Sequence, residues 1–166
     1  MIVPSWYQWA RHEIGTREIP GPDHEKRVLE YWALGKVPLD VRDDEVPWCA
    51  AFVNAALESS GLPGSRSGRA RSFYVGHDFV PSDARTGAIV VLSSDRGVAS
   101  GHVGFLSGVG SGRLVLLGGN QGNRVCEAPF DAKKLIVMLW PRIAPPFHHY
   151  PKAATVDANG RLVSDG

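Results

Sequence analysis

Residues 47–57 have the sequence PWCAAFVNAAL, a nearly unbroken apolar run that predicts a helix. Proline suits the first position of a helix, where its missing N–H would have had no intrahelical partner. The helix is therefore expected to begin near Pro47 and to end at Gly61. Cys49 lies in its first turn, on the same face as Phe52, Val53, Ala56 and Leu57.

Two further helices are predicted before this one and a short helix after it. Apolar residues recur at helical spacing from about Pro4 to Ile14, and Gly15 ends that segment. Asp23 is the expected N-cap of a second helix, which runs through Trp32. A loop rich in glycine and serine follows the central helix, and residues 70–75 are expected to form a short helix.

The second half of the chain has the pattern of a β-sheet. Short β-rich runs are separated by glycine, serine or aspartate, at 87–92, 102–106, 113–117, 124–128 and 135–140. Helices first and strands afterwards predict an α+β fold, with the N-terminal helices packed on a C-terminal antiparallel sheet of about five strands. Residues 1–145 are expected to form one domain, and residues 146–166 a tail that is either a hairpin around Asn159-Gly160 or flexible.

Composition excludes several classes of protein. The 166 residues carry 18 basic and 17 acidic side chains, a net charge of +1 that gives no reason to expect nucleic acid as a partner. No apolar run approaches the roughly 20 residues of a membrane span, so membrane insertion is not expected. The N-terminal MIVPSW lacks the features of a Sec signal peptide. Two cysteines are too few for a disulfide scaffold, and Cys126 is expected to be a small buried apolar residue.

Cys49 is the candidate nucleophile. Unpaired amides in the first turn of a helix carry partial positive charge, which favours the thiolate over the thiol. A buried structural cysteine is the alternative at this position. The acidic residues Asp43, Asp44 and Glu45 lie just upstream and oppose thiolate formation. They are expected to cap the helix or solvate a loop, with a calcium site as the alternative.

His102 is the candidate base among six histidines. It opens a predicted strand in Gly101-His102-Val103-Gly104, and the flanking glycines allow another backbone or a substrate to approach closely. A purely structural strand-edge histidine is the alternative. His148 and His149 could form an incidental metal contact, but the spacing of the sequence suggests no third ligand.

Asn120 is the candidate orienting group. It follows the predicted strand at residues 113–117 within Gly118-Gly119-Asn120-Gln121-Gly122. A hairpin of this strand with the preceding one brings Asn120 close to His102 at one end of the sheet. An imidazole base needs a partner on its second nitrogen, and a neutral amide serves that purpose in Cys-His-Asn sites. A simple turn, for which Asn and Gly are suited, is the alternative.

These motifs together resemble the CHAP and related papain-like peptidoglycan hydrolases, found in phage endolysins and secreted wall-degrading proteins. The resemblance is carried by PWCAAFVN at 47–54, GHVGF at 101–105 and GGNQ at 118–121, in that order. It extends to EIG at 13–15, EIPG at 18–21, EYW at 30–32 and ARSF at 70–73. It covers about residues 6–140 and leaves the tail unexplained.

The resemblance implies a papain-like fold and a cysteine amidase or endopeptidase that cuts the peptide part of peptidoglycan. Cys49, His102 and Asn120 fall on the three catalytic positions of the family. Many CHAP enzymes carry an acidic residue at the third position, so Asn120 assigns this chain to the amide-bearing branch. Trp48 and Gln121 are candidates for shaping the substrate or oxyanion pocket, and no cofactor or metal is expected.

The expected partner is therefore peptidoglycan, acted on in the periplasm or cell wall by a monomer that is made in the cytoplasm. A phage apparatus, a secretion apparatus or a cognate immunity protein are further partners that the family implies. Three alternatives remain from the sequence: a non-hydrolytic wall-binding domain, a cysteine protease or deamidase acting on proteins, and a metal site. The bond that is cut is not predicted.

Overall fold

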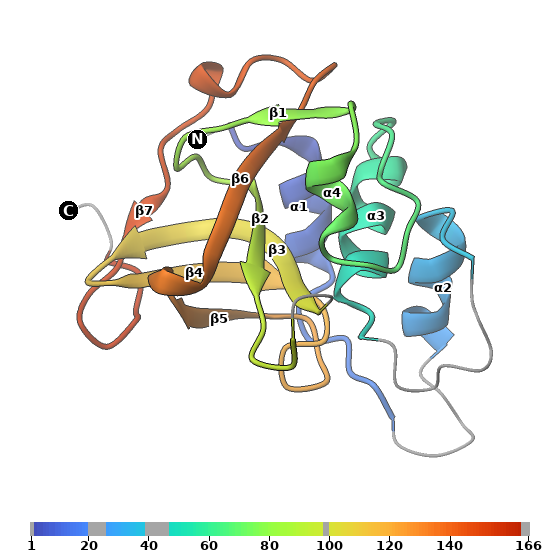
Figure 1. Ribbon diagram of the computed structural model, residues 1–166, viewed down its shortest axis with the longest axis horizontal. Coiled ribbons are helices and arrows are strands. Elements are labelled where there is room, and N and C mark those ends of the chain that lie inside the picture. Colours follow the sequence, from blue (N-terminus) through green and yellow to red (C-terminus); the bar gives the residue numbers. More distant parts are fainter. Residues whose placement is uncertain (1, 20–25, 39–46, 98–99, 164–166) are drawn as a thin grey trace.

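Four α-helices lie on one side of a β-sheet in the computed structural model, which describes residues 2–19, 26–38, 47–97 and 100–163. The helices are α1 (Ser5–His12), α2 (Lys26–Leu34), α3 (Cys49–Ser59) and α4 (Ser72–Val75). Figure 1 shows them gathered beside the end of the sheet, with α3 between α1 and α2. The predicted N-cap Asp23 and the acidic segment 40–45 lie outside the described residues.

The central helix α3 is buried along most of its length. Every residue from Cys49 to Leu57 is buried, including the polar Asn54. The Asn54 side chain is satisfied by the next loop, since its Nδ2 donates to Ser67 O (3.0 Å) and its Oδ1 accepts from Arg66 N–H (3.1 Å). A buried amide with partners at both ends avoids the desolvation penalty of an unpaired polar group. The loop is therefore fixed to the helix that carries Cys49.

The described strands form one seven-stranded sheet, which corrects the expectation of about five. The strands are β1 (Phe79–Pro81), β2 (Ile89–Ser93), β3 (Gly101–Gly110), β4 (Arg113–Gly118), β5 (Cys126–Asp131), β6 (Leu135–Pro141) and β7 (Ala154–Thr155). Their order is β1-β6-β2-β3-β4-β5, all antiparallel, and β7 pairs with β3 in parallel. The two strands that the sequence did not predict, β1 and β7, have three and two residues, too few to show an alternating pattern.

The segment after residue 145 packs on the sheet. Besides the β7 pairing, Val156 and Leu162 form an antiparallel bridge, and Gly160 lies in the turn between them with φ 75°. Val156 is buried against β3, where a side chain on Gly108 or Gly110 would collide with it. The described part of the tail thus covers one face of β3.

Strands β2, β3 and β4 form the middle of the sheet and carry most of its buried side chains. β2 is buried at four successive positions and β4 at five, which is typical of strands covered on both faces. β3 contacts α3, and Val103 near the start of β3 lies beside Cys49. This packing fixes the start of α3 against the start of β3, where Cys49 and His102 lie. In the part of the chain that the structure describes, no helix has the length and apolarity of a membrane span.

Candidate active site

Cys49 is the first residue of α3 and is held against the sheet with only 2% of its surface exposed. The preceding Trp48 lies at the N-cap and packs its indole ring on Tyr31 with ring centroids 5.9 Å apart. The Trp48 indole N–H donates to Glu18 Oε2 at 3.1 Å. This anchoring of the N-cap holds the sulfur at the end of the helix where unpaired amides concentrate.

The thiol of Cys49 and the imidazole of His102 interact, and each shifts the pKa of the other. Burial raises the pKa of Cys49, but the hydrogen bond and charge of His102, together with the amides of Val103 and Ala50, lower it further than burial raises it. Burial likewise lowers the pKa of His102, and the interactions with Cys49 and Gln121 outweigh it, so that the pKa is raised. Both shifts favour a thiolate beside an imidazolium.

The amide of Val103 is available to the sulfur because of how β3 is paired. Leu106 N–H donates to Ala88 O at 2.9 Å, so alternate residues of β3 direct their amides toward β2. The amide of Val103 has the opposite parity and faces the β4 side. Pairing with β4 begins only at Phe105, opposite Leu117. Val103 therefore lies on a free stretch of strand edge that α3 approaches.

Gln121 holds the other side of the imidazole. Its Oε1 lies 2.9 Å from His102 Nε2, and its Nε2 donates to Leu116 O (3.1 Å) and Cys126 O (2.7 Å). Two carbonyl acceptors fix which end of the amide is nitrogen, so Oε1 is the atom that faces the ring. An oxygen acceptor there requires the proton of neutral His102 to be on Nε2. The other nitrogen, Nδ1, is then left as the base for the thiol.

The position expected for Asn120 is taken by its neighbour, which corrects the sequence prediction. Gln121 makes the contact to His102, whereas Asn120 is partly exposed and adopts a positive φ of 55° in the turn after β4. Asparagine tolerates this conformation, so the turn interpretation describes Asn120 better than the orienting one. Asn120 and Gln121 both carry side-chain amides, and the backbone conformation of the turn determines which of the two faces His102.

Trp48 and Gln121, expected to shape the substrate pocket, are both buried. The Trp48 side chain lies among Tyr31, Phe52 and Glu18, and it does not line the cleft beside His102. Gln121 has both amide hydrogens directed at backbone carbonyls, which leaves none for an oxyanion. Both residues therefore support the site from behind, and neither has the geometry of a pocket-lining donor.

Two glycines allow the loop to reach this position. A side chain on Gly118 would collide with Gln121 Oε1. A Cβ on Gly119 would lie 2.7 Å from Phe52 Cβ and 2.7 Å from the Trp48 ring. Real side chains do not accept such distances, so the GG pair lets the loop lie directly on the start of α3. Gly118 and Gly119 are thus the feature of the sequence that could have indicated a close approach of Gln121 to the site.

A cleft of about 490 Å³ opens beside the imidazole. His102 and Asn120 line it together with Pro47, Phe130, Leu92, Ser93, Ser94, Asp95, Arg96, Ser100, Gly101 and Lys134. Phe130 stacks on the His102 ring with centroids 5.0 Å apart and planes at 26°. A ligand in this cleft would contact His102 directly, whereas Cys49 is buried behind the lining residues.

Neither cysteine forms a disulfide. Cys126 was expected to be buried but is only partly buried. Cys126 is partly exposed at the start of β5, and its Sγ donates to Gln121 O at 3.4 Å. Over the described ranges, no three His, Cys, Asp or Glu side chains group as metal ligands. The His148 and His149 rings contact each other with centroids 4.6 Å apart, well away in sequence from the site.

Comparison of the chain with protein-family models, with curated proteins and with solved structures found no match. Assignment of a function therefore depends on the chemistry of Cys49, His102 and Gln121 and on the motifs that carry them.

Proposed function

We propose that this chain is a papain-like cysteine hydrolase that cleaves an amide bond in the peptide part of peptidoglycan. The single observation that carries the proposal is the ordered contact from Cys49 through His102 to Gln121 at the start of α3. A structural cysteine needs no basic partner, and a structural histidine needs no fixed tautomer. Such an arrangement of nucleophile, base and orienting group is the geometric signature of nucleophilic catalysis.

The reaction follows from the protonation states of the pair. The Cys49 thiolate attacks the amide carbonyl, and the imidazolium of His102 gives its Nδ1 proton to the leaving amine. A thioester remains on the sulfur. His102, now neutral, takes a proton from water, whose oxygen attacks the thioester and releases the acid. The C–S bond breaks with Cys49 leaving as the thiolate while His102 keeps the proton from water, so the thiolate–imidazolium pair is regenerated without a cofactor.

Charge that develops on the carbonyl oxygen needs donors at the same place. The first amides of α3 have no intrahelical acceptors, and the N–H of Cys49 belongs to this set. Its position at the positive end of the helix supports a role as an oxyanion donor.

The choice of substrate rests on the resemblance of the motifs at 47–54, 101–105 and 118–121 to peptidoglycan hydrolases. The mixed α+β architecture with helices beside an antiparallel sheet is compatible with a papain-like fold. Action on the cell wall, by delivery from a phage or a secretion apparatus, is part of the same proposal.

The test is digestion of purified sacculi by the protein and by its Cys49→Ala variant, with mass spectrometry of the released fragments. We expect new amine and carboxylate ends from the wild type and a loss of at least about 1,000-fold in rate for the variant. Thermal unfolding of both proteins establishes that the variant is folded. A folded Cys49→Ala protein that still releases fragments would refute the proposal. Release of peptides from a protein substrate, with intact sacculi, would replace peptidoglycan with protein as the substrate.

A further inference from the structure

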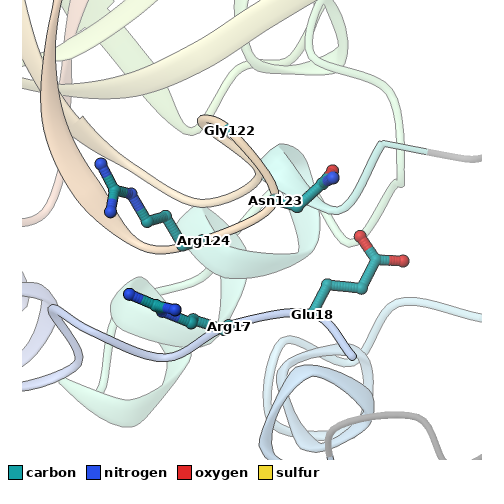
Figure 2. Close-up of a pocket in the computed structure, with 5 residues that line it drawn as sticks. All are labelled: Arg17, Glu18, Gly122, Asn123 and Arg124. Carbon is teal, nitrogen blue, oxygen red and sulfur yellow. The ribbon is translucent and has the colours of Figure 1, made fainter. Parts of the chain in front are cut away.

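A second cleft lies on the other side of the loop that carries Gln121. It has a volume of about 320 Å³ and is lined by Arg17, Glu18, Gly122, Asn123 and Arg124 (Figure 2). The segment around Arg17 follows α1, and Arg124 ends the loop. Two arginines, distant in sequence, are therefore brought into one small cleft.

Backbone pairing sets the two arginine side chains on one face. Glu18 N–H donates to Asn123 O (2.8 Å) and Val125 N–H donates to Thr16 O (2.9 Å), and these bonds enclose the bridge between Arg17 and Arg124. Residues paired in this way form a non-hydrogen-bonded antiparallel pair, with Cα atoms only about 4.5 Å apart and side chains on the same face. Figure 2 shows both side chains extending in the same direction.

The two guanidinium groups have no acidic partner among the described residues. Glu18 is the carboxylate nearest in sequence, and Figure 2 shows it directed away from both arginines. Its Oε2 instead accepts the Trp48 indole N–H. Like charges directly opposite each other in a strand pair are destabilising. An anion bound between them would remove that repulsion, and two guanidinium groups match the geometry of a carboxylate.

The cleft is coupled to the candidate active site through the loop. Gln121 N–H donates to Arg124 O at 3.0 Å, and the Gln121 side chain contacts His102. On the other wall, Glu18 contacts Trp48, the residue before Cys49. Both walls of this cleft are thus hydrogen-bonded to residues that contact His102 or precede Cys49, which places the cleft next to the candidate active site.

We propose that the cleft of Arg17 and Arg124 binds a carboxylate of the peptide substrate, at a position away from the amide that is cut. The proposal rests on the proposed function for the identity of the substrate. It makes the enzyme selective for peptides with a free acid at that position over those in which the acid is an amide.

The test uses one stem peptide of peptidoglycan in two forms, with a free side-chain carboxylate and with the corresponding carboxamide. We expect wild-type protein to have a KM about tenfold lower for the acid, as charge-assisted hydrogen bonds would give. In the double variant Arg17→Gln/Arg124→Gln this preference is lost, with kcat little changed. Arg113→Gln removes the same charge from the opposite end of β4 and should keep the preference. Thermal unfolding establishes that each variant is folded.

Binding to the Cys49→Ala protein, measured by calorimetry, separates this proposal from the proposed function. Acid-selective binding that depends on both arginines supports the carboxylate site even if the wild type cuts neither peptide. Equal binding of acid and amide, or selectivity that survives in the double variant, overturns it. Inorganic phosphate is the third ligand tested. If phosphate binds in a way that depends on the two arginines while the two peptides bind equally, the proposed carboxylate selectivity is overturned and the cleft is a general anion site.

Discussion

The side-chain amide of Gln121 determines which ring nitrogen of neutral His102 carries the proton. Its nitrogen is saturated by the carbonyls of Leu116 and Cys126, so its oxygen must face the imidazole. One buried side chain thereby selects the tautomer of a histidine 19 residues earlier in the chain. Removal of Gln121 should therefore affect protonation as well as position.

Gln121→Met, which keeps the volume and loses the hydrogen bonds, is expected to lower kcat about 100-fold, within the range of general acid–base contributions. Asn120→Gly retains the positive φ and removes the other amide, and kcat should change by less than about threefold. Rates on sacculi and thermal unfolding of both variants provide the measurement. A loss for Asn120→Gly as large as that for Gln121→Met would return the orienting role to Asn120.

The coupled shifts of Cys49 and His102 predict a pH dependence of thiol reactivity. The pKa of Cys49 is lowered and that of His102 raised, so both shifts favour the thiolate–imidazolium ion pair over the neutral pair. Alkylation of Cys49 should stay fast below the ordinary thiol pKa of about 8.5 and fall only as the pH drops through the lowered value. In His102→Ala burial dominates, and alkylation at pH 6.5 should slow at least about tenfold.

Peptide mapping after brief treatment with iodoacetamide gives the rates, with Cys126 as an internal comparison in the same chain. The ion pair is disproved if the pH profile for Cys49 is the same in the wild type and in His102→Ala.

The sequence was enough to predict that Cys49 and His102 lie close together, which the structure shows. A cysteine in the first turn of an apolar helix and a histidine between strand glycines each have a definite place once the fold class is known. The contact of Gln121 with His102 was not predicted, because Asn120 and Gln121 are adjacent amides. Which of them faces inward depends on a turn with positive φ at residues 120, 122 and 123, and neither periodicity nor propensity specifies that turn.

At the scale of elements, the loop after β4 is shaped by Gly118 and Gly119. Gly118→Ala would push against Gln121 Oε1 and displace it from His102, so activity should fall as far as in Gln121→Met. Gly76→Ala is the matched control, because the nearest atom to a Cβ there is Ser72 O at 3.9 Å and its φ is −94°. Rates on sacculi and thermal unfolding test the pair. Full activity in Gly118→Ala would show that the loop accommodates a Cβ at residue 118 without displacing Gln121 from His102.

The far end of α3 is fixed by Glu58, whose side chain is 8% exposed. Burial raises the pKa of Glu58, but hydrogen bonds from Arg66 and from the Gly64 amide, and the charges of Arg66 and Lys36, lower it overall. Because the folded pKa is depressed, the stabilisation is present above the ordinary carboxyl pKa and is lost as the pH falls through the lowered value.

Glu58→Gln is therefore expected to reduce the free energy of unfolding by about 1 kcal/mol at pH 7. The difference from the wild type should disappear in acid, where the native carboxyl is also protonated. Urea unfolding at pH 7 and at a series of lower pH values measures both. A difference that stays the same at every pH would mean that the carboxylate charge contributes nothing.

Helices and long strands were predictable because their apolar periodicity is local. Trp6 and Ala10 of α1, and the apolar run of α3, specify their elements within one or two turns of chain. β1 and β7 were not predictable, since a strand of two or three residues is defined by its partner. β7 exists only because Gly108 and Val109 of β3 offer it an edge to pair with.

At the scale of the whole molecule, the C-terminal segment belongs to the core of the domain. Val156 is 2% exposed and fills the space that Gly108 and Gly110 leave on β3. Phe147 and Tyr150 pack on Trp140 with ring centroids 6.2 and 5.4 Å away. Ending the domain at residue 145, as the sequence predicted, would remove these contacts and expose the face of β3.

A chain that ends at residue 145 should therefore be less stable by at least about 3 kcal/mol, the combined contribution of one buried valine and two partly buried aromatic rings. For a chain of this size the unfolding midpoint should fall by roughly 10 °C. Val156→Ala in the full chain isolates part of the effect and should reduce the free energy of unfolding by about 1–2 kcal/mol. Calorimetry of the three proteins tests the prediction. If the 1–145 chain unfolds at the same temperature as the full chain, the segment only rests on the sheet. If both full-length proteins unfold in one transition and the short chain melts earlier, the sheet that positions His102 depends on residues that lie outside every motif of the site.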